Sequence, residues 1–292
     1  MINVVAPAKI NLFLRICGKN NAGYHLLDSL VAFTEYGDNL TIYPADKDEL
    51  VLTGEFAGTV NTHTKNNLVI RALNAFRQSG GRIGPLRIVL EKKIPVGAGL
   101  GGGSSDAAAL LLAINEQSKT PLSKYNLYDI GLKLGADVPV CLVRGCQRIA
   151  NIGEILTPHD LPKIGAVLLI NPGIALSTKD VFNSFAHSNK KSGSGFGGPL
   201  SMLNAANIVE LGNDLTETAA SLVPQIKLCL DELKGARGIV AAAMSGSGAS
   251  CFAFFENRDA AKITAKNLQN VGFWTQVTRI LQLKTQAHPH PF

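Results

Sequence analysis

The sequence has few of the features that mark secreted, membrane-spanning and nucleic-acid-binding proteins. Its first residues contain no basic stretch followed by a long apolar segment, so we expect no signal peptide. No run of uninterrupted apolar residues reaches about 18 residues, the length that a membrane-spanning helix requires. The net charge is +6, yet the basic residues form no cluster interleaved with aromatics, which argues against nucleic acid as a partner. We expect a cytoplasmic protein, either a monomer or a homodimer, with no membrane or nucleic-acid partner.

Cysteine is also scarce. The five cysteines are an odd number without CxxC spacing, so neither a disulfide framework nor a cysteine metal site is expected. Two histidines near the C-terminus, His288 and His290, stand among prolines. We interpret them as part of a solvated end in preference to a metal site.

The residues that are present are typical of a globular protein with a sizeable core. Hydrophobic residues make up 46% of the chain and charged residues 17%. Strand-like and helix-like patterns share the chain, which predicts an α+β fold, and the length favours two domains. We expect an N-terminal domain over residues 1–160, a C-terminal domain over 161–282 and a flexible tail over 283–292. The polar, glycine-rich segment 188–200 is the best candidate for a mobile loop.

The most informative stretch is PVGAGLGGGSSDA, residues 95–107. Its five glycines lack Cβ atoms, so they tolerate positive φ and let a ligand approach the backbone closely. Ser104, Ser105 and Asp106 are residue types that open a helix, and the apolar run 107–114 continues that helix. Successive N–H groups in such a loop, together with the positive end of the helix, bind anions. We therefore predict a phosphate site at this loop.

A linker, a dinucleotide site and a triphosphate P-loop each fit this stretch less well. A flexible linker would be polar on both sides, whereas the strand-like run 86–90 precedes the loop and an apolar helix follows it. Gly97, Gly99 and Gly102 satisfy the GxGxxG dinucleotide pattern, but that pattern needs a second strand ending in an acid about 20 residues on. Glu116 stands near that distance at the end of a helix, and the next segment looks helical. A P-loop fails because no Gly-Lys-Ser/Thr closes the loop.

Three further patterns each have a purely structural explanation when they are considered separately. Alternating apolar residues from Ile10 to Ile16 predict a half-buried strand with Lys9 and Asn11 on its other face, where lysine is commonly solvated. Asp137 stands two residues before a proline, as a helix N-cap does. The Ser-Gly-Ser-Gly run 245–248 lies between two apolar segments and suits a hairpin turn.

Taken together, these patterns resemble a known family. The segments 7–12, 95–105 and 245–248 resemble, in this order, the three motifs of the galactokinase, homoserine kinase, mevalonate kinase and phosphomevalonate kinase (GHMP) superfamily. Further similarity at 23–25, 135–139 and 153–154 extends the resemblance from residue 3 to about residue 280.

The resemblance implies a two-domain GHMP-kinase-like fold with the active site in the interdomain cleft. It implies transfer of a phosphoryl group from ATP, with Mg²⁺ expected beside the nucleotide, to a small-molecule alcohol. The motif set is most similar to the branch that acts on the 2-hydroxyl of a cytidine-diphosphate sugar alcohol, 4-(cytidine 5′-diphospho)-2-C-methyl-D-erythritol, in the non-mevalonate isoprenoid pathway.

The resemblance also assigns expected roles to residues. Asp137 would be the catalytic base, with Lys9 beside it. Residues that would bind the acceptor are Asn11, Tyr24, His25, Thr178 and Phe182. Tyr24 and Phe182 would enclose the cytosine ring, and His25 would bond to its polar edge. The loop residues that would bind ATP are Pro95, Val96, Gly97, Ala98, Gly99, Leu100, Gly101, Gly102, Gly103, Ser104 and Ser105. No metal ligand is assigned beyond a contact of Mg²⁺ with Ser104 or Ser105.

Two competing functions stay open at this point. One is a regulator of the same family that binds a nucleotide or small metabolite without catalysis, although keeping both Lys9 and Asp137 argues against it. The other is a nicotinamide-dependent dehydrogenase, which rests only on Gly97, Gly99 and Gly102.

Overall fold

The computed structural model describes residues 1–60, 66–161, 163–187, 195–198 and 200–282. Most of the predicted mobile loop 188–200 lies outside the described residues, and so does the predicted tail 283–292 with His288 and His290. Within the described part, no helix combines the length and the apolar character needed to cross a membrane.

The N-terminal half is built on a six-stranded sheet. Its centre is a long antiparallel pair, β1 (Ile2–Lys19) and β2 (His25–Pro44), in which Ile2 lies opposite Ile42 and Lys19 opposite His25. The other strands follow the order β3-β4-β2-β5-β6, with only β3 and β4 parallel. These strands are β3 (Glu49–Thr53), β4 (Leu86–Glu91), β5 (Gln147–Asn151) and β6 (Ile155–Pro158).

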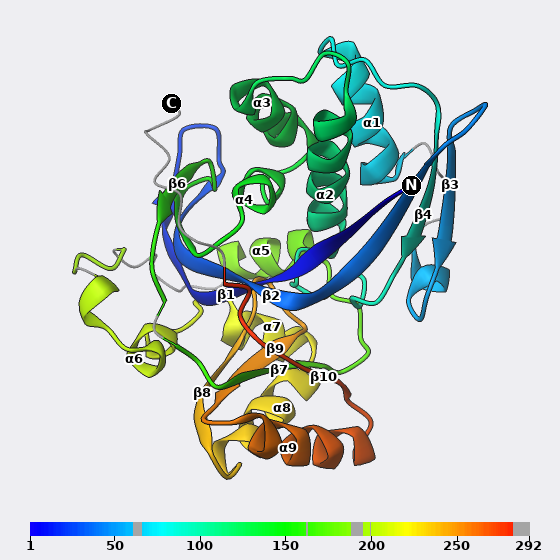
Figure 1. The fold of residues 1–292 in the computed structure, drawn as a ribbon. Coiled ribbons are helices and arrows are strands. Elements are labelled where there is room, and N and C mark those ends of the chain that lie inside the picture. The colour runs from blue at the N-terminus through cyan, green and yellow to red at the C-terminus, as the bar shows by residue number, and fades with distance from the viewer. Residues whose placement is uncertain (61–65, 162, 188–194, 199, 283–292) are drawn as a thin grey trace.

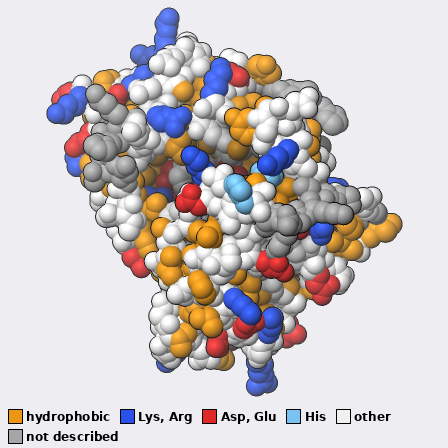
Figure 2. All heavy atoms as spheres, turned by 180° about the vertical axis from the view of Figure 1, so that it is seen from behind, with side chains coloured by type: hydrophobic (Ala, Val, Ile, Leu, Met, Phe, Trp, Pro, Cys, Tyr) orange, Lys and Arg blue, Asp and Glu red, His pale blue; other side chains and the backbone are white. Residues whose placement is uncertain are grey.

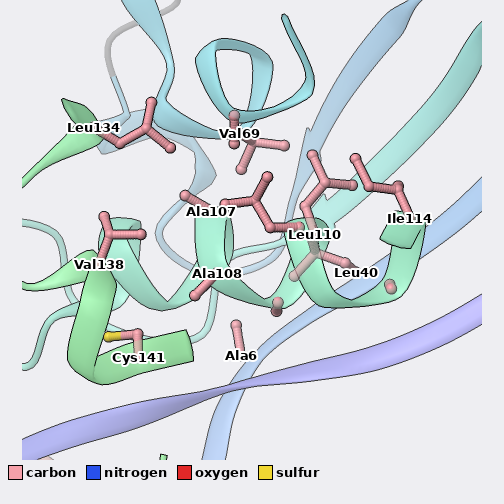
Figure 3. Close-up of a cluster of buried hydrophobic side chains, with 14 of the residues drawn as sticks. Ala6, Leu40, Val69, Ala107, Ala108, Leu110, Ile114, Leu134, Val138 and Cys141 are labelled. Carbon is pink, nitrogen blue, oxygen red and sulfur yellow. The ribbon is translucent and has the colours of Figure 1, made fainter. Parts of the chain in front are cut away.

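Four helices cover one face of this sheet (Figure 1). They are α1 (Leu68–Gln78), α2 (Gly102–Gln117), α3 (Lys124–Leu134) and α4 (Val138–Val143). The stretch 107–114 of helix α2 is apolar all round, and it is buried among the sheet, α1 and α4 as such a stretch must be. Figure 3 shows its Ala107, Ala108 and Leu110 packed between Val69 of α1 and Ala6 of β1. A short 3-10 turn, η1 (Ala57–Thr59), follows β3.

The C-terminal half is built on a four-stranded antiparallel sheet in the order β10-β7-β9-β8. Its strands are β7 (Ala166–Asn171), β8 (Ile239–Met244), β9 (Cys251–Phe255) and β10 (Trp274–Thr278). Its helices are α5 (Thr178–His187), α6 (Ala205–Glu210), α7 (Thr216–Leu222), α8 (Gln225–Lys234) and α9 (Arg258–Asn270), with the 3-10 turn η3 (Leu200–Met202).

The two sheets share a core. Ile10 and Leu12 of β1 belong to the same buried cluster as Val167 and Leu169 of β7 and Phe252 of β9. Strand β1 therefore has the N-terminal helices on one side and the C-terminal sheet on the other. The α+β prediction is confirmed, and the strands and helices predicted from periodicity are present.

Two local predictions were wrong. Strand β1 is buried on both faces rather than half-buried, because the C-terminal sheet covers its Ile10 and Leu12 face while Lys9 on the other face is covered by the glycine loop and Asp137. Helix α2 begins at Gly102 after a left-handed Gly101 (φ 66°), so Asp106 lies inside the helix and does not open it.

The chain after α2 excludes a dinucleotide-binding unit. A βαβ unit requires a strand after the helix, whereas α2 is followed by the helices α3 and α4. The dehydrogenase hypothesis therefore has no structural support.

Candidate active site

The glycine loop 95–101 joins β4 to α2 and lines a cavity of about 970 Å³. Gly97, Gly99 and Gly101 have φ values of 64°, 74° and 66°, which favour glycine. At Gly99 a Cβ would also lie 2.4 Å from the carbonyl oxygen of Ser245, so no side chain fits. The first N–H groups of α2 have no partner within the helix, and Gly101–Ser104 bring them to the cavity wall. Such an arrangement of main-chain donors is suited to bind an anion.

The structure brings Lys9 and Asp137 together at this cavity. The Nζ atom of Lys9 donates a hydrogen bond of 3.1 Å to Oδ1 of Asp137. The Lys9 side chain is only 5% exposed, whereas that of Asp137 is 46% exposed, so the carboxylate is open to a ligand. Lys9 also packs against Gly101, where a Cβ would approach its side chain to 3.2 Å. The pair therefore lies directly beside the glycine loop.

Asp137 occupies the N-cap position of α4 but does not act as a cap. Its side chain accepts no hydrogen bond from the helix backbone, and Pro139 in the first turn removes one donor in any case. The carboxylate is directed to Lys9 instead. A capping role therefore does not account for the position of Asp137.

The turn 245–250 between β8 and β9 supports the glycine loop from the C-terminal side. The hydroxyl of Ser245 donates to the carbonyl of Gly99 at 2.9 Å, and the N–H of Ser250 donates to the carbonyl of Ala98 at 3.1 Å. The N–H of Asn11 in turn donates to the Ser245 hydroxyl at 3.2 Å. These bonds hold β1, the loop and the C-terminal hairpin in one arrangement.

The five predicted acceptor residues all line the same cavity. The rings of His25 and Phe182 lie 5.2 Å apart between centroids with an angle of 38°. Thr178 and Ser247 share a hydrogen bond of 2.9 Å between their hydroxyls. Tyr24 is 64% exposed and stands at the mouth. Figure 2 shows the hollowed face, with acidic, basic and histidine side chains gathered around the opening.

Two buried polar atoms of the acceptor side have no hydrogen-bond partner among the described residues. They are Oδ1 of Asn11 and Nδ1 of His25. Burial lowers the pKa of His25, and Lys19 lowers it further, so the ring is neutral at pH 7. Because buried polar atoms are normally paired, both atoms are suited to bind a ligand.

Two residues of the predicted loop set do not line the cavity. Leu100 is buried in the core between the sheets. Ser105 is buried as well, and its hydroxyl donates to the carbonyl of Pro7 at 2.8 Å. Of the two serines considered for a metal contact, only Ser104 faces the cavity.

Sequence reasoning missed a charged cluster under the loop, made of Asp38, Lys92 and Asp106. The Nζ atom of Lys92 donates to Oδ2 of Asp38 and, at 2.7 Å, to Oδ2 of Asp106. All three residues are buried. Desolvation raises the pKa of Asp106 to about 8, against the opposing effect of the Lys92 charge. A signal was present in the sequence, since Asp106 is an acid directly before the apolar run 107–114.

The described residues contain no group of three or more His, Cys, Asp and Glu side chains able to hold a metal ion. The cavity nevertheless fits Mg²⁺ bound to a nucleotide, because Mg²⁺ takes most of its ligands from phosphates and water and needs only one or two protein carboxylates. Oxygen donors in the lining of the cavity include Asp137, Asp106 and the hydroxyl of Ser104.

Comparisons with known proteins agree with this geometry. The model of the GHMP kinases N-terminal domain matches residues 67–145, and that of the GHMP kinases C-terminal domain matches residues 198–272. Proteins named 4-diphosphocytidyl-2-C-methyl-D-erythritol kinase are similar over nearly the whole chain. The one from Brucella abortus is 42% identical, covering 94% of this chain and 93% of its own. The one from Cereibacter sphaeroides is 39% identical, covering 96% and 100%.

Solved structures show the same architecture. A crystal structure of 4-(cytidine 5′-diphospho)-2C-methyl-D-erythritol kinase superimposes with a TM-score of 0.79 at 30% identity, covering 95% of this chain and 99% of that one. A homoserine kinase from Cytophaga hutchinsonii superimposes with a TM-score of 0.71 at 22% identity, covering 96% and 95%, which shows a common fold.

Proposed function

The chain belongs to the GHMP kinase family, and from this premise we propose that it transfers the γ-phosphoryl group of ATP to the 2-hydroxyl of 4-(cytidine 5′-diphospho)-2-C-methyl-D-erythritol. The reaction is a step of the non-mevalonate isoprenoid pathway. The observation that carries the kinase chemistry is the 3.1 Å contact between Lys9 and Asp137 beside the anion-binding loop. Similarity to the named relatives supports the acceptor.

Asp137 is the proposed base that takes the proton of the acceptor hydroxyl. Its carboxylate is half-exposed to the cavity and held in place by Lys9, so it can accept a proton without having to reorient. Phosphoryl transfer depends chiefly on in-line positioning and on compensation of charge at the γ-phosphate. Lys9 serves both needs, because its ammonium can contact the acceptor oxygen while it balances the carboxylate.

The glycine loop and the first turn of α2 are the proposed binding site for the triphosphate. Ser245 and Ser250 donate hydrogen bonds to the carbonyls of Gly99 and Ala98 and so hold the loop backbone, which means that its N–H donors need not rearrange during the reaction. Mg²⁺ is the proposed companion of ATP, and when bound it offsets the charge that develops on the phosphates. Ser104 is the loop hydroxyl that faces this region.

The cytosine of the acceptor is proposed to lie between Tyr24 and Phe182. Stacking alone does not choose a base, so hydrogen bonds must supply the selectivity. The unpaired Nδ1 of His25 is available for such a bond, and the ring is held against Phe182. Asn11, with its unpaired Oδ1, and Thr178 complete the proposed acceptor side.

The domain division that we propose places the boundary near residue 160. Strands β1 to β6 form the N-terminal sheet and β7 to β10 the C-terminal one, which supports a nucleotide domain over 1–160 and an acceptor domain over 161–282. The cavity is lined from both sides, by the glycine loop and by residues of α5 and the 245–250 turn. A cleft between domains is where a family of this fold would bind two substrates.

The proposal is tested by incubating the purified protein with magnesium ATP and each candidate alcohol. We expect rapid formation of ADP with the cytidine-diphosphate sugar alcohol and little with homoserine, mevalonate or galactose. Preference for another alcohol would leave the family assignment but remove this acceptor. Tight ATP binding without transfer to any alcohol would instead identify a regulator.

A further inference from the structure

Among the described residues that line the cavity, three lysines carry a positive charge, and two of them already have carboxylate partners. The three are Lys9, Lys92 and Lys179. Lys9 bonds to Asp137, and Lys92 bonds to two buried acids. Lys179 is exposed and forms no hydrogen bond or ion pair with any described residue. Of these three ammonium groups, that of Lys179 is therefore the one free to bind an anion.

Helix α5 places Lys179 beside the proposed cytosine site. The residues of this helix that line the cavity are Thr178, Lys179, Phe182 and Asn183. Lys179 and Phe182 are three positions apart, so their Cβ atoms lie about 5–6 Å apart on one side of the helix. The lysine is thus the neighbour of the ring that is proposed to hold the base.

A line of contacts leads from this end of the cavity to the end where the reaction takes place. The hydroxyls of Thr178 and Ser247 share a hydrogen bond of 2.9 Å. A Cβ built on the adjacent Gly246 would lie 3.5 Å from Oδ1 of Asn11, which stands two positions along β1 from Lys9. In the proposed acceptor the diphosphate joins the cytidine to the alcohol that reacts. We therefore expect the diphosphate to pass the first turn of α5, which carries the unpaired lysine.

The diphosphate needs a positive partner that the rest of the site does not supply. The ammonium of Lys9 is bonded to Asp137, and the N–H groups of the glycine loop are assigned to the triphosphate of ATP. A multiply charged anion is costly to remove from water unless it gains a counter-charge or hydrogen-bond donors. Lysine binds phosphate as a point charge with three donors, so it suits this need.

Helix stability does not explain the position of Lys179. The residue lies in the first turn of α5, where the partial positive charge of the helix end opposes a cation. Asp180 is its neighbour in sequence, but residues one position apart do not face each other on a helix. An anion bound beside this turn would compensate the charge of the lysine.

We propose that Lys179 binds the diphosphate of the acceptor and thereby selects cytidine-diphosphate compounds over uncharged nucleosides. This inference rests on the proposed function, because it takes the acceptor and the place of its cytosine from there. Lys179 is a binding and specificity residue, and the transfer itself belongs to Lys9 and Asp137. Because Lys179 is exposed, dissolved salt screens its attraction for the diphosphate.

The test compares the binding of CDP with that of cytidine, because these ligands differ only in the diphosphate. Calorimetry gives both dissociation constants for the wild type, Lys179→Gln and Lys179→Arg. We expect Lys179→Gln to bind CDP about tenfold more weakly, near the lower end of what a hydrogen bond to a charged group contributes. Its affinity for cytidine should equal that of the wild type. Lys179→Arg keeps the charge and should keep most of the affinity for CDP.

A matched control removes a lysine of the same kind elsewhere. Lys266 is an exposed lysine of α9 that does not line the cavity. Lys266→Gln makes the same change in charge as Lys179→Gln, so it reports any effect of net charge alone. We expect it to leave the affinities for CDP and cytidine unchanged.

Steady-state kinetics with the complete acceptor give a second measurement. In Lys179→Gln the KM for the acceptor should rise about tenfold, with kcat and the KM for ATP nearly unchanged. Such a pattern is expected when a contact binds the ground state and the transition state equally. Added salt should raise the acceptor KM of the wild type more than that of Lys179→Gln.

The outcomes distinguish this inference from the proposed function. Equal affinity for CDP in the wild type and Lys179→Gln would overturn the role of Lys179. Equal losses for CDP and cytidine, or a loss for ATP in place of CDP, would overturn it as well. In each of these cases turnover of the cytidine-diphosphate acceptor by the wild type would leave the proposed function intact. Absence of both CDP binding and turnover in the folded wild type would overturn both.

Discussion

Two lysine–carboxylate contacts lie close together beside the glycine loop, and they differ in burial. Lys9 pairs with one acid, Asp137, whose side chain is 46% exposed to the cavity. Lys92 pairs with two acids, Asp38 and Asp106, whose side chains are no more than 3% exposed. The Lys9–Asp137 contact leaves its carboxylate accessible to a substrate, and we call it the open contact. The contact of Lys92 with Asp38 and Asp106 is shielded from solvent, and we call it the closed contact.

The difference shows that lysine and carboxylate groups can have different roles according to how deeply they are buried. An exposed carboxylate keeps access to water and ligands, so it can exchange a proton during a reaction. A buried carboxylate must keep its partner or its proton, because an isolated charge is expensive away from water. The open contact therefore suits chemistry, and the closed one suits the placement of the backbone around the nucleotide.

The largest effect should come from the open contact. Asp137→Asn keeps the size of the side chain but removes the base, so we expect turnover to fall by roughly 10²- to 10⁴-fold with little change in the KM for ATP. Steady-state kinetics with the cytidine-diphosphate acceptor measure this. Unchanged turnover would remove Asp137 from its proposed role and end the contrast between the two contacts.

Breaking the closed contact should affect folding first. Lys92→Met leaves two buried carboxylates without their ammonium, so we expect the free energy of unfolding to fall by about 3–5 kcal/mol. Urea titration followed by circular dichroism measures it. Adding Asp106→Asn to this variant should restore part of the loss, and a loss below about 1 kcal/mol in Lys92→Met would contradict the buried cluster.

The closed contact should also make stability depend on pH. Because the pKa of Asp106 is raised from 3.8 to about 8, its contribution to stability is fully present below pH 3.8 and is lost as the pH rises toward 8. The unfolding free energy of the wild type should therefore decline relative to Asp106→Asn between pH 5 and 8. Melting temperatures of the two proteins at each pH give this difference, and a constant difference would count against the raised pKa.

A pair on the surface of α3 supplies the lower end of the comparison. Lys133 and Asp129 form an i,i+4 contact at 2.6 Å, with side chains 74% and 46% exposed. Water and salt screen such pairs, so Asp129→Asn should change the free energy of unfolding by only about 0.3–0.5 kcal/mol. The same urea titration measures it, and a loss near that of Lys92→Met would show that burial does not set the scale.

Features carried by neighbouring residues could be predicted from the sequence. The clustered glycines of 95–103 predicted the loop, alternation predicted the direction of Lys9 and Asn11 along β1, and the proline after Asp137 predicted the start of α4. The family resemblance then brought Lys9 and Asp137 together, 128 positions apart, and the structure places them 3.1 Å apart.

Features that depend on contacts between distant segments could not be predicted. The burial of Lys9 depends on the glycine loop and on Asp137, which cover it from segments far along the chain, and no local pattern reports this. Asp38 and Lys92 meet across 54 residues, and Asp106 has the residue type of a helix opener although α2 begins at Gly102. The burial of a residue depends on which distant segments pack against it, and the periodicity within one segment does not predict those contacts.

The bonds from Ser245 and Ser250 to the carbonyls of Gly99 and Ala98 have a consequence for how such a protein can be altered. The nucleotide loop belongs to the first half of the chain by sequence, but its shape is completed by a hairpin from the second half. In a chimera that joins halves from two relatives, the glycine loop of one protein would therefore be supported by the hairpin of the other. The ATP affinity of the chimera would measure how well that loop and that hairpin fit together.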